Sequence, residues 1–175
     1  MSDLIKLKLV TEGEAECLHK LQVEAFIPLY EKYQDDDTSP AKESLERITE
    51  KIIEDNSDFY FIIFHGEKVG GVRVKWRQGK NVHENVKWIS PIFINPKFQN
   101  KGIAGRAIEQ LSEIYPDTTE WCLDTIKQEK GNYHLYEKCG FVRVGKDIEV
   151  NEKMTLVMYV KSMNVRKFSE EEVSV

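Results

Sequence analysis

Residues 92–106 of this 175-residue chain read IFINPKFQNKGIAGR. An apolar stretch typical of a buried strand passes through a loop with Gly102 into a helical pattern. Such a junction aims unpaired backbone N–H groups and the positive end of a helix dipole at one point, which suits a phosphate group. Lys97, Lys101 and Arg106 add positive charge there.

The glycine pattern of this loop excludes two familiar nucleotide sites. The loop lacks the terminal Lys-Ser/Thr of a P-loop, and its spacing is not the GxGxxG of a dinucleotide site. The small residues Gly102, Ala104 and Gly105 would still let a ligand approach the backbone closely. A helix start that serves packing alone is the alternative interpretation.

Strand and helix patterns alternate on both sides of the loop. Strand patterns occur at residues 5–9, 59–65, 69–76, 85–94, 121–126, 141–148 and 154–160. Helical spacing begins near residue 12, runs again from 39 to about 54, and recurs at 102–115 and 132–139. This order predicts an α+β domain with one main sheet, part antiparallel and part parallel.

Three prolines modify these predictions. Pro28 should kink or end the first helix, so one helix or two short ones fit that segment equally well. Ser39 followed by Pro40 is typical of an N-cap and first helical residue, which places the start of the second helix there. Pro91 cannot donate a hydrogen bond to a neighbouring strand, so it indicates a bulge or a sheet edge within 85–94.

Charge is distributed unevenly along the chain. The 25 Lys and Arg and 30 Asp and Glu give a net charge of −5. Residues 1–58 carry a net −8, residues 59–115 a net +5 and residues 116–175 a net −2. Acidic ends and the lack of a basic stripe disfavour nucleic acid, whereas a small phosphorylated ligand fits the basic middle. Solvated charged faces are the alternative.

The sequence does not indicate a membrane-spanning protein, a disulfide-stabilised protein or a metalloprotein. The longest apolar run, Phe59 to Phe64, is far shorter than the roughly 20 residues of a membrane-spanning helix. The first ten residues do not resemble a secretory signal, so we expect a cytoplasmic protein without a membrane partner. Cys17, Cys122 and Cys139 are odd in number and widely spaced, which favours reduced thiols. The four histidines show no paired spacing with them, so we expect no metal.

Two motifs resemble signatures of the GNAT superfamily of acetyl-CoA-dependent N-acetyltransferases. The segment 99–104, QNKGIA, matches Gln/Arg-x-x-Gly-x-Gly/Ala between a strand and a helix. The segment 132–141, NYHLYEKCGF, is similar to the second signature, a short helix with asparagine and tyrosine that closes in Gly-Phe. The order of elements from about residue 5 to 160 also resembles the family.

The resemblance implies a GNAT-like α+β fold. Its central sheet is mixed and mostly antiparallel, about four helices flank it, and its central strand pair is splayed. We expect one N-acetyltransferase domain over residues 1–161 and a flexible tail over 162–175. A bulge at Pro91 would draw the strand at 85–94 away from the strand at 121–126 and open the cleft that the family uses.

The resemblance also implies where acetyl-CoA binds. The backbone of Ile92, Phe93 and Ile94 would hold the pantetheine arm and polarise the thioester carbonyl. Backbone N–H groups of the loop would receive the pyrophosphate, from Gln99, Asn100, Lys101, Gly102, Ile103 and Ala104. Asn132 would orient the cofactor or Tyr136; a helix cap is its alternative role.

The family's chemistry needs an acid and a base. Tyr136 matches the tyrosine that protonates the departing thiolate, although a half-buried aromatic residue would look the same. Many relatives carry a glutamate on the central strand, which is absent here. Asp124 is the nearest alternative as the base. It could instead be an acid that faces solvent, and Glu84 or His83 could take the role of base in its place.

The first two helices should meet the acceptor. Phe26, Tyr30 and Tyr33 lie there beside the acidic residues 35–37, a composition that favours a polyamine-like or other amine-bearing cation. A solvated loop above core aromatics is the alternative. The predicted activity is transfer of an acetyl group to a primary amine of a small molecule or peptide, by direct attack in a ternary complex. A protein lysine or N-terminus is also open as acceptor.

Two further questions stay open at this point. A catalytically weak or inactive acyl-CoA-binding sensor or partner module would have the same fold. Edge strands within 141–160 could pair two copies into a homodimer.

Overall fold

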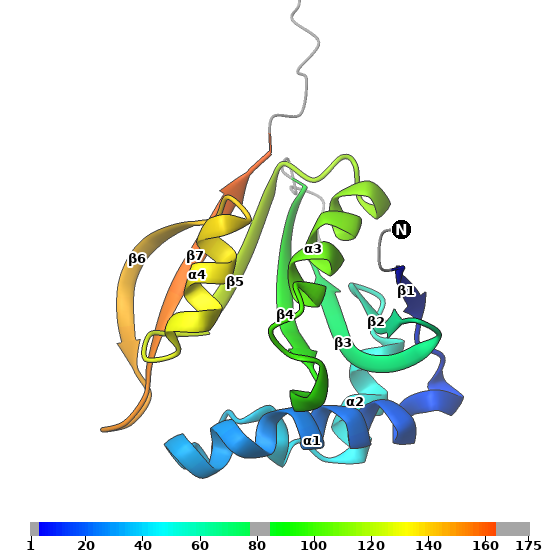
Figure 1. Ribbon diagram of the computed structural model, residues 1–175, viewed down its shortest axis with the longest axis horizontal. Helices are drawn as coiled ribbons and strands as arrows, with labels where there is room; N and C mark the ends of the chain where they lie inside the picture. Colours follow the sequence, from blue (N-terminus) through cyan, green and yellow to red (C-terminus); the bar gives the residue numbers. More distant parts are fainter. Residues whose placement is uncertain (1–3, 78–84, 164–175) are drawn as a thin grey trace, which may run out of the picture.

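The computed structural model describes residues 4–77 and 85–163, and one seven-stranded sheet organises them (Figure 1). In spatial order the strands are β1 (Ile5–Leu9), β2 (Ser57–Phe64), β3 (Glu67–Lys75), β4 (Val86–Ile94), β5 (Glu120–Ile126), β7 (Thr155–Ser162) and β6 (Val142–Glu149). Neighbouring strands are antiparallel except β4 and β5, which are parallel. The predicted mixed, mostly antiparallel sheet is confirmed.

Four α-helices cover the two faces of the sheet. They are α1 (Ala15–Tyr33), α2 (Leu45–Ile53), α3 (Ile103–Ile114) and α4 (Lys130–Lys138), and short 3₁₀ turns lie at Glu12–Glu14, Pro40–Lys42 and Pro96–Phe98. Residues of α1 and α2 share a core cluster with Phe59, Phe61 and Phe93. Residues of α3 and α4 share the other cluster with Tyr60 and Ile62. Because side chains alternate along a strand, these clusters lie on opposite faces.

Pro28 does not end the first helix. It lies inside α1, which continues to Tyr33 and ends at Gln34 in a left-handed conformation. A proline removes one backbone donor from a helix. The buried side chains of Leu18 and Ala25 before it and of Tyr33 after it pack into the structure, so tertiary packing outweighs this local loss.

The predicted start of the second helix was wrong. The Ser39 hydroxyl accepts a hydrogen bond from Ala41 N at 3.2 Å, but this cap opens only the turn Pro40–Lys42. The helix α2 begins five residues later, where the Ser44 hydroxyl accepts from Arg47 N at 3.1 Å. Two serines five residues apart both have good capping chemistry, so local pattern alone did not choose between them.

The central strand pair is splayed, as the sequence predicted. Strands β4 and β5 pair at three positions, the last being Trp88 opposite Cys122. On its other side, β4 shifts register against β3, since Val72 faces Ile92 whereas Val74 faces Ile89. One extra residue therefore lies in β4 around Pro91, which is the predicted bulge. Beyond Trp88 the two halves of the sheet separate, as Figure 1 shows.

The strand β6 forms one edge of the sheet. All eight of its residues are exposed, and its pairing with β7 is interrupted between Val144 and Ile148. The homodimer predicted through this edge stays a prediction. The strand β7 ends at Ser162, and residues 164–175 of the predicted tail lie outside the described residues.

A glycine in β3 sets how closely β4 can approach. A Cβ atom at Gly70 would lie 2.1 Å from the carbonyl oxygen of Phe93, whereas one at Gly13 would meet nothing within 4 Å. We predict that Gly70→Ala lowers the free energy of unfolding by about 1–3 kcal/mol, because backbone must move to relieve the overlap. Gly13→Ala should change it by less than about 0.5 kcal/mol. Urea unfolding of both variants tests this, and equal stabilities would contradict it.

Candidate functional site

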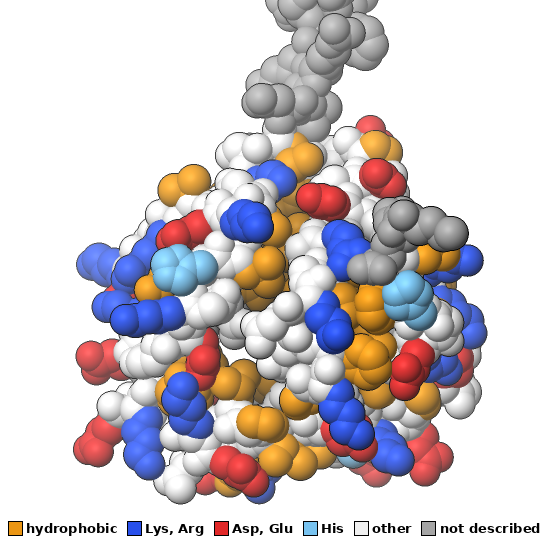
Figure 2. Space-filling view, in the orientation of Figure 1, with side chains coloured by type: hydrophobic (Ala, Val, Ile, Leu, Met, Phe, Trp, Pro, Cys, Tyr) orange, Lys and Arg blue, Asp and Glu red, His pale blue; other side chains and the backbone are white. Residues whose placement is uncertain are grey.

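Two adjoining cavities open where the halves of the sheet separate. The loop cavity, about 580 Å³, lies beside residues 98–104, and the helix cavity, about 270 Å³, lies beside α1. Both are lined by Phe26, Leu29, Ile92, Asn132 and Tyr136, so the two cavities adjoin at these residues. Figure 2 shows hydrophobic side chains along the middle of this face, between the halves.

The loop cavity receives the unpaired N–H groups of the start of α3. The first helical hydrogen bond runs from Arg106 N to Gly102 O at 3.2 Å, which leaves the N–H groups of Ile103, Ala104 and Gly105 without helical partners. Gly102 has a φ of 75° and Asn100 a φ of 63°. These left-handed conformations turn the chain sharply into the helix, and glycine adopts them without strain.

The Arg106 side chain holds the carbonyl groups of this loop. Its guanidinium donates to Lys101 O at 2.8 Å and to Gly102 O at 3.4 Å. Because the N–H of a peptide unit points opposite to its C=O, the N–H groups of Gly102 and Ile103 point away from Arg106. Both residues line the loop cavity. Arg106 thus orients donors as well as adding positive charge.

The β4 backbone presents alternate residues to the opening. Asn95 N donates to Val69 O of β3 at 2.7 Å. Since backbone groups alternate in direction along a strand, Phe93 also faces β3, whereas Ile92 and Ile94 face the opening. The Gln99 side-chain amide donates to Ile94 O at 3.0 Å, which leaves the N–H of Ile94 and both groups of Ile92 for a ligand.

The predicted cofactor residues gather at the loop cavity with one exception. Its lining contains Ile92, Phe93, Ile94, Gln99, Asn100, Gly102, Ile103, Ala104 and Asn132. Phe93 contributes its ring, which packs edge-on against Phe26 with centroids 5.6 Å apart. Lys101 is exposed and is not part of the lining.

Tyr136 lies at the junction of the two cavities. Its side chain is 7% exposed, and its ring lies 6.1 Å from that of Phe141 and 6.5 Å from that of Tyr159. Burial, with a smaller effect from Cys139, raises the pKa of Tyr136 to about 12. The phenol is therefore protonated at neutral pH, which is the form that an acid needs.

Asn132 stands one helical turn before Tyr136 and lines both cavities. The alternative role of Asn132 as a helix cap is wrong, because α4 begins at Lys130 and Glu129 occupies the cap position. Residues i and i+4 share one helix face, so Asn132 and Tyr136 present their side chains to the same opening.

Asp124 faces the helix cavity from β5. Its side chain is exposed into the cavity, yet the surrounding protein withdraws it from bulk water. This desolvation raises the pKa of Asp124 above its usual range, while the charge of Lys75 acts in the opposite direction. Within the described residues its carboxylate has no hydrogen bond or ion pair. The competing bases His83 and Glu84 lie outside the described residues.

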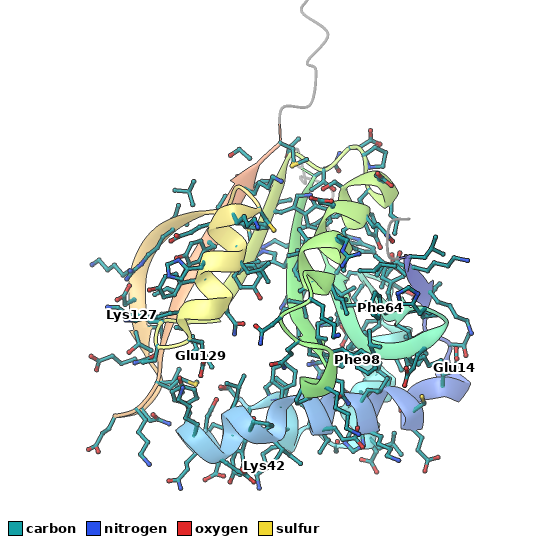
Figure 3. The ribbon with its side chains drawn as sticks, viewed as in Figure 1. Glu14, Lys42, Phe64, Phe98, Lys127 and Glu129 are labelled. Carbon is teal, nitrogen blue, oxygen red and sulfur yellow. The ribbon has the colours of Figure 1, made fainter. Side chains whose placement is uncertain are left out.

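The predicted acceptor residues line the helix cavity. Phe26 borders both cavities, and Tyr30 and Tyr33 border the helix cavity from α1. The hydroxyl of Tyr33 donates to Glu129 Oε1 at 2.7 Å, and Lys32 Nζ lies 2.9 Å from the same oxygen. These bonds join the end of α1 to the start of α4, where Figure 3 labels Glu129.

The acidic loop after α1 is largely engaged in its own structure. Asp35 is 6% exposed, and its carboxylate accepts hydrogen bonds from the N–H groups of Asp37 and Thr38 and from the Thr38 hydroxyl. The Tyr30 hydroxyl donates to Asp36 Oδ1 at 2.5 Å. These side chains build the cavity wall through contacts that the sequence did not reveal.

Some lining residues were not predicted. Pro40, Met154 and Leu156 border the helix cavity from the turn after α1 and from the β6–β7 hairpin. The sequence did not mark them as site residues, because similar apolar residues fill the core elsewhere in the chain. The pairing of β7 with β5 places Leu156 opposite Ile126, two residues along β5 from Asp124.

Neither a membrane-spanning helix nor a cluster of metal ligands is found among the described residues. No helix among them is long and apolar enough to cross a membrane. In the same part of the chain, no three His, Cys, Asp or Glu side chains gather as metal ligands would.

Comparison with known proteins identifies the family. The Acetyltransferase (GNAT) family model matches residues 18–141, which include both motifs. The uncharacterised protein YrkN of Bacillus subtilis (strain 168) is 28% identical over 137 residues, 77% of this chain and 71% of YrkN.

Solved structures show the same fold. An acetyl transferase of Salmonella typhimurium that modifies the N-terminal serine of ribosomal protein L7/L12 matches with a TM-score of 0.72 at 16% identity, covering 94% of this chain and 97% of that one. The aminoglycoside acetyltransferase AAC(6')-Ib in complex with coenzyme A matches with a TM-score of 0.67 at 19% identity, covering 91% and 95%. The chain therefore belongs to the GNAT family of acetyl-CoA-dependent acetyltransferases.

Proposed function

We propose that this enzyme transfers the acetyl group of acetyl-CoA to a primary amine by direct attack in a ternary complex. The observation that carries the proposal is the meeting of the two cavities at Tyr136 and Asn132. A donor in the loop cavity and an acceptor in the helix cavity would meet there, beside the open edge of β4.

The residues of the loop cavity fit acetyl-CoA. The N–H groups of residues 99–104 would bind the pyrophosphate at the positive end of α3. The C=O of Ile92 and the N–H of Ile94 would pair with the amides of the pantetheine arm, while Phe93 packs beneath them. The printed descriptions of AAC(6')-Ib and of the self-immunity acetyltransferase MccE, complexes with coenzyme A and with acetyl-CoA and AMP, support this assignment.

The chemistry requires one bond to form and one to break. When bound, acetyl-CoA supplies an acetyl group activated as a thioester. Asp124 accepts a proton from the acceptor's ammonium group, directly or through water, and frees the nitrogen lone pair. That pair forms the C–N bond to the acetyl carbon, and the C–S bond breaks with its electrons passing to sulfur. Tyr136 gives its proton to the departing thiolate. The nitrogen, positively charged after attack, loses its second proton through water, which restores the neutral amide and the Tyr136 phenol.

The remaining catalytic role, stabilisation of the oxyanion, would belong to the bulge in β4. Negative charge develops on the acetyl oxygen during attack, and a fixed N–H donor stabilises it more in the transition state than in the ground state. The N–H of Ile92 faces the opening directly after Pro91. We assign the oxyanion-stabilising role to this group.

The cofactor loop can be tested through two glycines with left-handed φ. Gly102 has a φ of 75° and Gly66, in the distant β2–β3 turn, a φ of 80°. Alanine at either position should lower stability by about 1–2 kcal/mol, because the left-handed conformation disfavours a Cβ. Gly102→Ala alone should weaken acetyl-CoA binding, by roughly tenfold or more, because it displaces the N–H donors. Calorimetric titration with acetyl-CoA measures this, and an unchanged Kd for Gly102→Ala would contradict the site.

The acid can be tested by removing one hydroxyl. Tyr136→Phe should lower kcat by about 10²- to 10⁴-fold, since proton donation to sulfur is lost. The Kd for acetyl-CoA should change little, because the ring is kept. Tyr133→Phe, on the same helix but outside both cavity linings, is the matched control.

A thiol-release assay with acetyl-CoA and a panel of amines measures both variants. Full activity in Tyr136→Phe would refute the role of the phenol. Tight acetyl-CoA binding by the unaltered protein without release for any amine would instead favour the acyl-CoA-binding module.

The assignment of Asp124 as the base predicts how kcat/KM depends on pH. The carboxylate of Asp124 is the active form, and its raised pKa means that it becomes protonated at a higher pH than an ordinary aspartate. The kcat/KM value should therefore fall as pH decreases through that raised pKa. Asp124→Asn should lower kcat/KM by about 10²-fold or more and remove this acid limb.

Asp117→Asn, on an exposed loop, is the control and should keep the acid limb of the unaltered enzyme. A near-normal rate and profile in Asp124→Asn would transfer the role of base to another group, such as His83 or Glu84.

A further inference from the structure

The helix cavity offers a single available negative charge. Two carboxylates line it, those of Asp35 and Asp124. Asp35 is buried and already accepts three hydrogen bonds from its own loop. Asp124 has no hydrogen bond or salt bridge within the described residues, and Lys75 acts on it only through its charge, from outside the cavity lining. A cation in this cavity would therefore find one carboxylate that is not already satisfied.

Two further acids near the cavity, outside its lining, are also engaged. Asp36 accepts the hydrogen bond of the Tyr30 hydroxyl. Glu129 binds Lys32 and Tyr33, and although burial alone would raise its pKa, these two bonds lower it, so the group is ionised and paired. Lys42 stands over the Tyr30 ring at 4.4 Å from its centroid and further reduces the negative potential at this wall.

The other lining residues are uncharged: ten are apolar and eight carry hydroxyl or amide groups, Ser90 and Thr125 among them. Leu29, Pro40, Leu123, Met154 and Leu156 contribute side chains without hydrogen-bonding groups. No lysine or arginine is found among the lining residues that the structure describes. A negatively charged group on the acceptor would thus meet no countercharge, and an apolar body would be removed from water at a gain.

We propose that the acceptor is a small primary amine with one ammonium group and an apolar or aromatic body. The inference rests on the proposed function and names the substrate class of that site. Asp124 binds the ammonium group, and the apolar wall binds the body. Polyamines and aminoglycosides are poor acceptors, because further ammonium groups lose water without gaining a countercharge. Amino acids are poor acceptors, because their carboxylate lies close to Asp124.

Matched pairs of amines isolate each part of the proposal. 2-Phenylethylamine and phenylalanine differ by one carboxylate, and butylamine and 1,4-diaminobutane differ by one ammonium group. We expect the first member of each pair to have a kcat/KM at least about tenfold higher in the thiol-release assay, and 2-phenylethylamine to exceed butylamine. An aminoglycoside should release little thiol.

A variant tests whether the cavity itself sets this order. Leu156→Glu adds a third carboxylate to the wall, the second one available to a cation, and should raise the ratio of kcat/KM for 1,4-diaminobutane to that for butylamine by about tenfold. Val142→Glu adds the same charge on exposed β6, outside the cavity lining, and should leave the ratio unchanged. Because each ratio is measured within one variant, a loss of folded protein does not alter it.

The outcomes separate this inference from the proposed function. Thiol release that is fastest with diamines, aminoglycosides or amino acids would overturn the inference and keep the acetyltransferase mechanism. An unchanged ratio in Leu156→Glu would also overturn it. No release with any amine, despite acetyl-CoA binding, would refute the proposed function itself.

Discussion

The structure depends on the separation of β4 from β5. Parallel strands normally continue their hydrogen bonding to the sheet's end, yet this pair stops at Trp88 and Cys122. The extra residue near Pro91 bends β4 while β3 still holds its other side. As a result, Ile92 and Ile94 expose backbone groups inside the molecule, where an unpaired polar group is costly unless a ligand satisfies it. The separation of the strands thus leaves backbone groups of β4 without hydrogen-bond partners, and a ligand that pairs with β4 would supply these partners.

The same separation explains why the two faces of the sheet cooperate. Asp124 belongs to the face covered by α1 and α2, whereas Tyr136 comes from α4 on the other face, and both reach one cavity because the sheet is open between them. A closed sheet would keep an acid and a base on opposite sides of a hydrogen-bonded layer. Their pKa values rise for one reason, withdrawal from water, but the consequences differ. Burial keeps the phenol protonated and makes the carboxylate a stronger base.

Sequence reasoning succeeded where the signal is local. The strand, loop and helix around Gly102 are encoded in one continuous stretch of sequence. Pro91 indicated the bulge in β4, because proline has no backbone N–H to donate to a neighbouring strand. Sequence reasoning was undecided or wrong where distant contacts decide. The sequence left one helix or two short ones equally open around Pro28, and the packing of α1 favours one. The start of the second helix was wrong, because the choice between Ser39 and Ser44 depends on the fold around them. The apolar residues of the β6–β7 hairpin join the site through strand pairing, which composition cannot reveal.

The acidic loop shows why counting charges in a sequence misjudges a binding site. Residues 35–37 suggest attraction for a polycation, but a carboxylate that caps its own loop has little capacity left for a ligand. Asp35 is such a group, and the hydrogen bonds of Asp36 and Glu129 likewise serve the wall. What a substrate meets is the charge that remains after internal hydrogen bonds are satisfied. In the helix cavity that remainder is one carboxylate, on Asp124, and if this cavity takes the acceptor as proposed, the shape of the acceptor's body should matter as much as its charge.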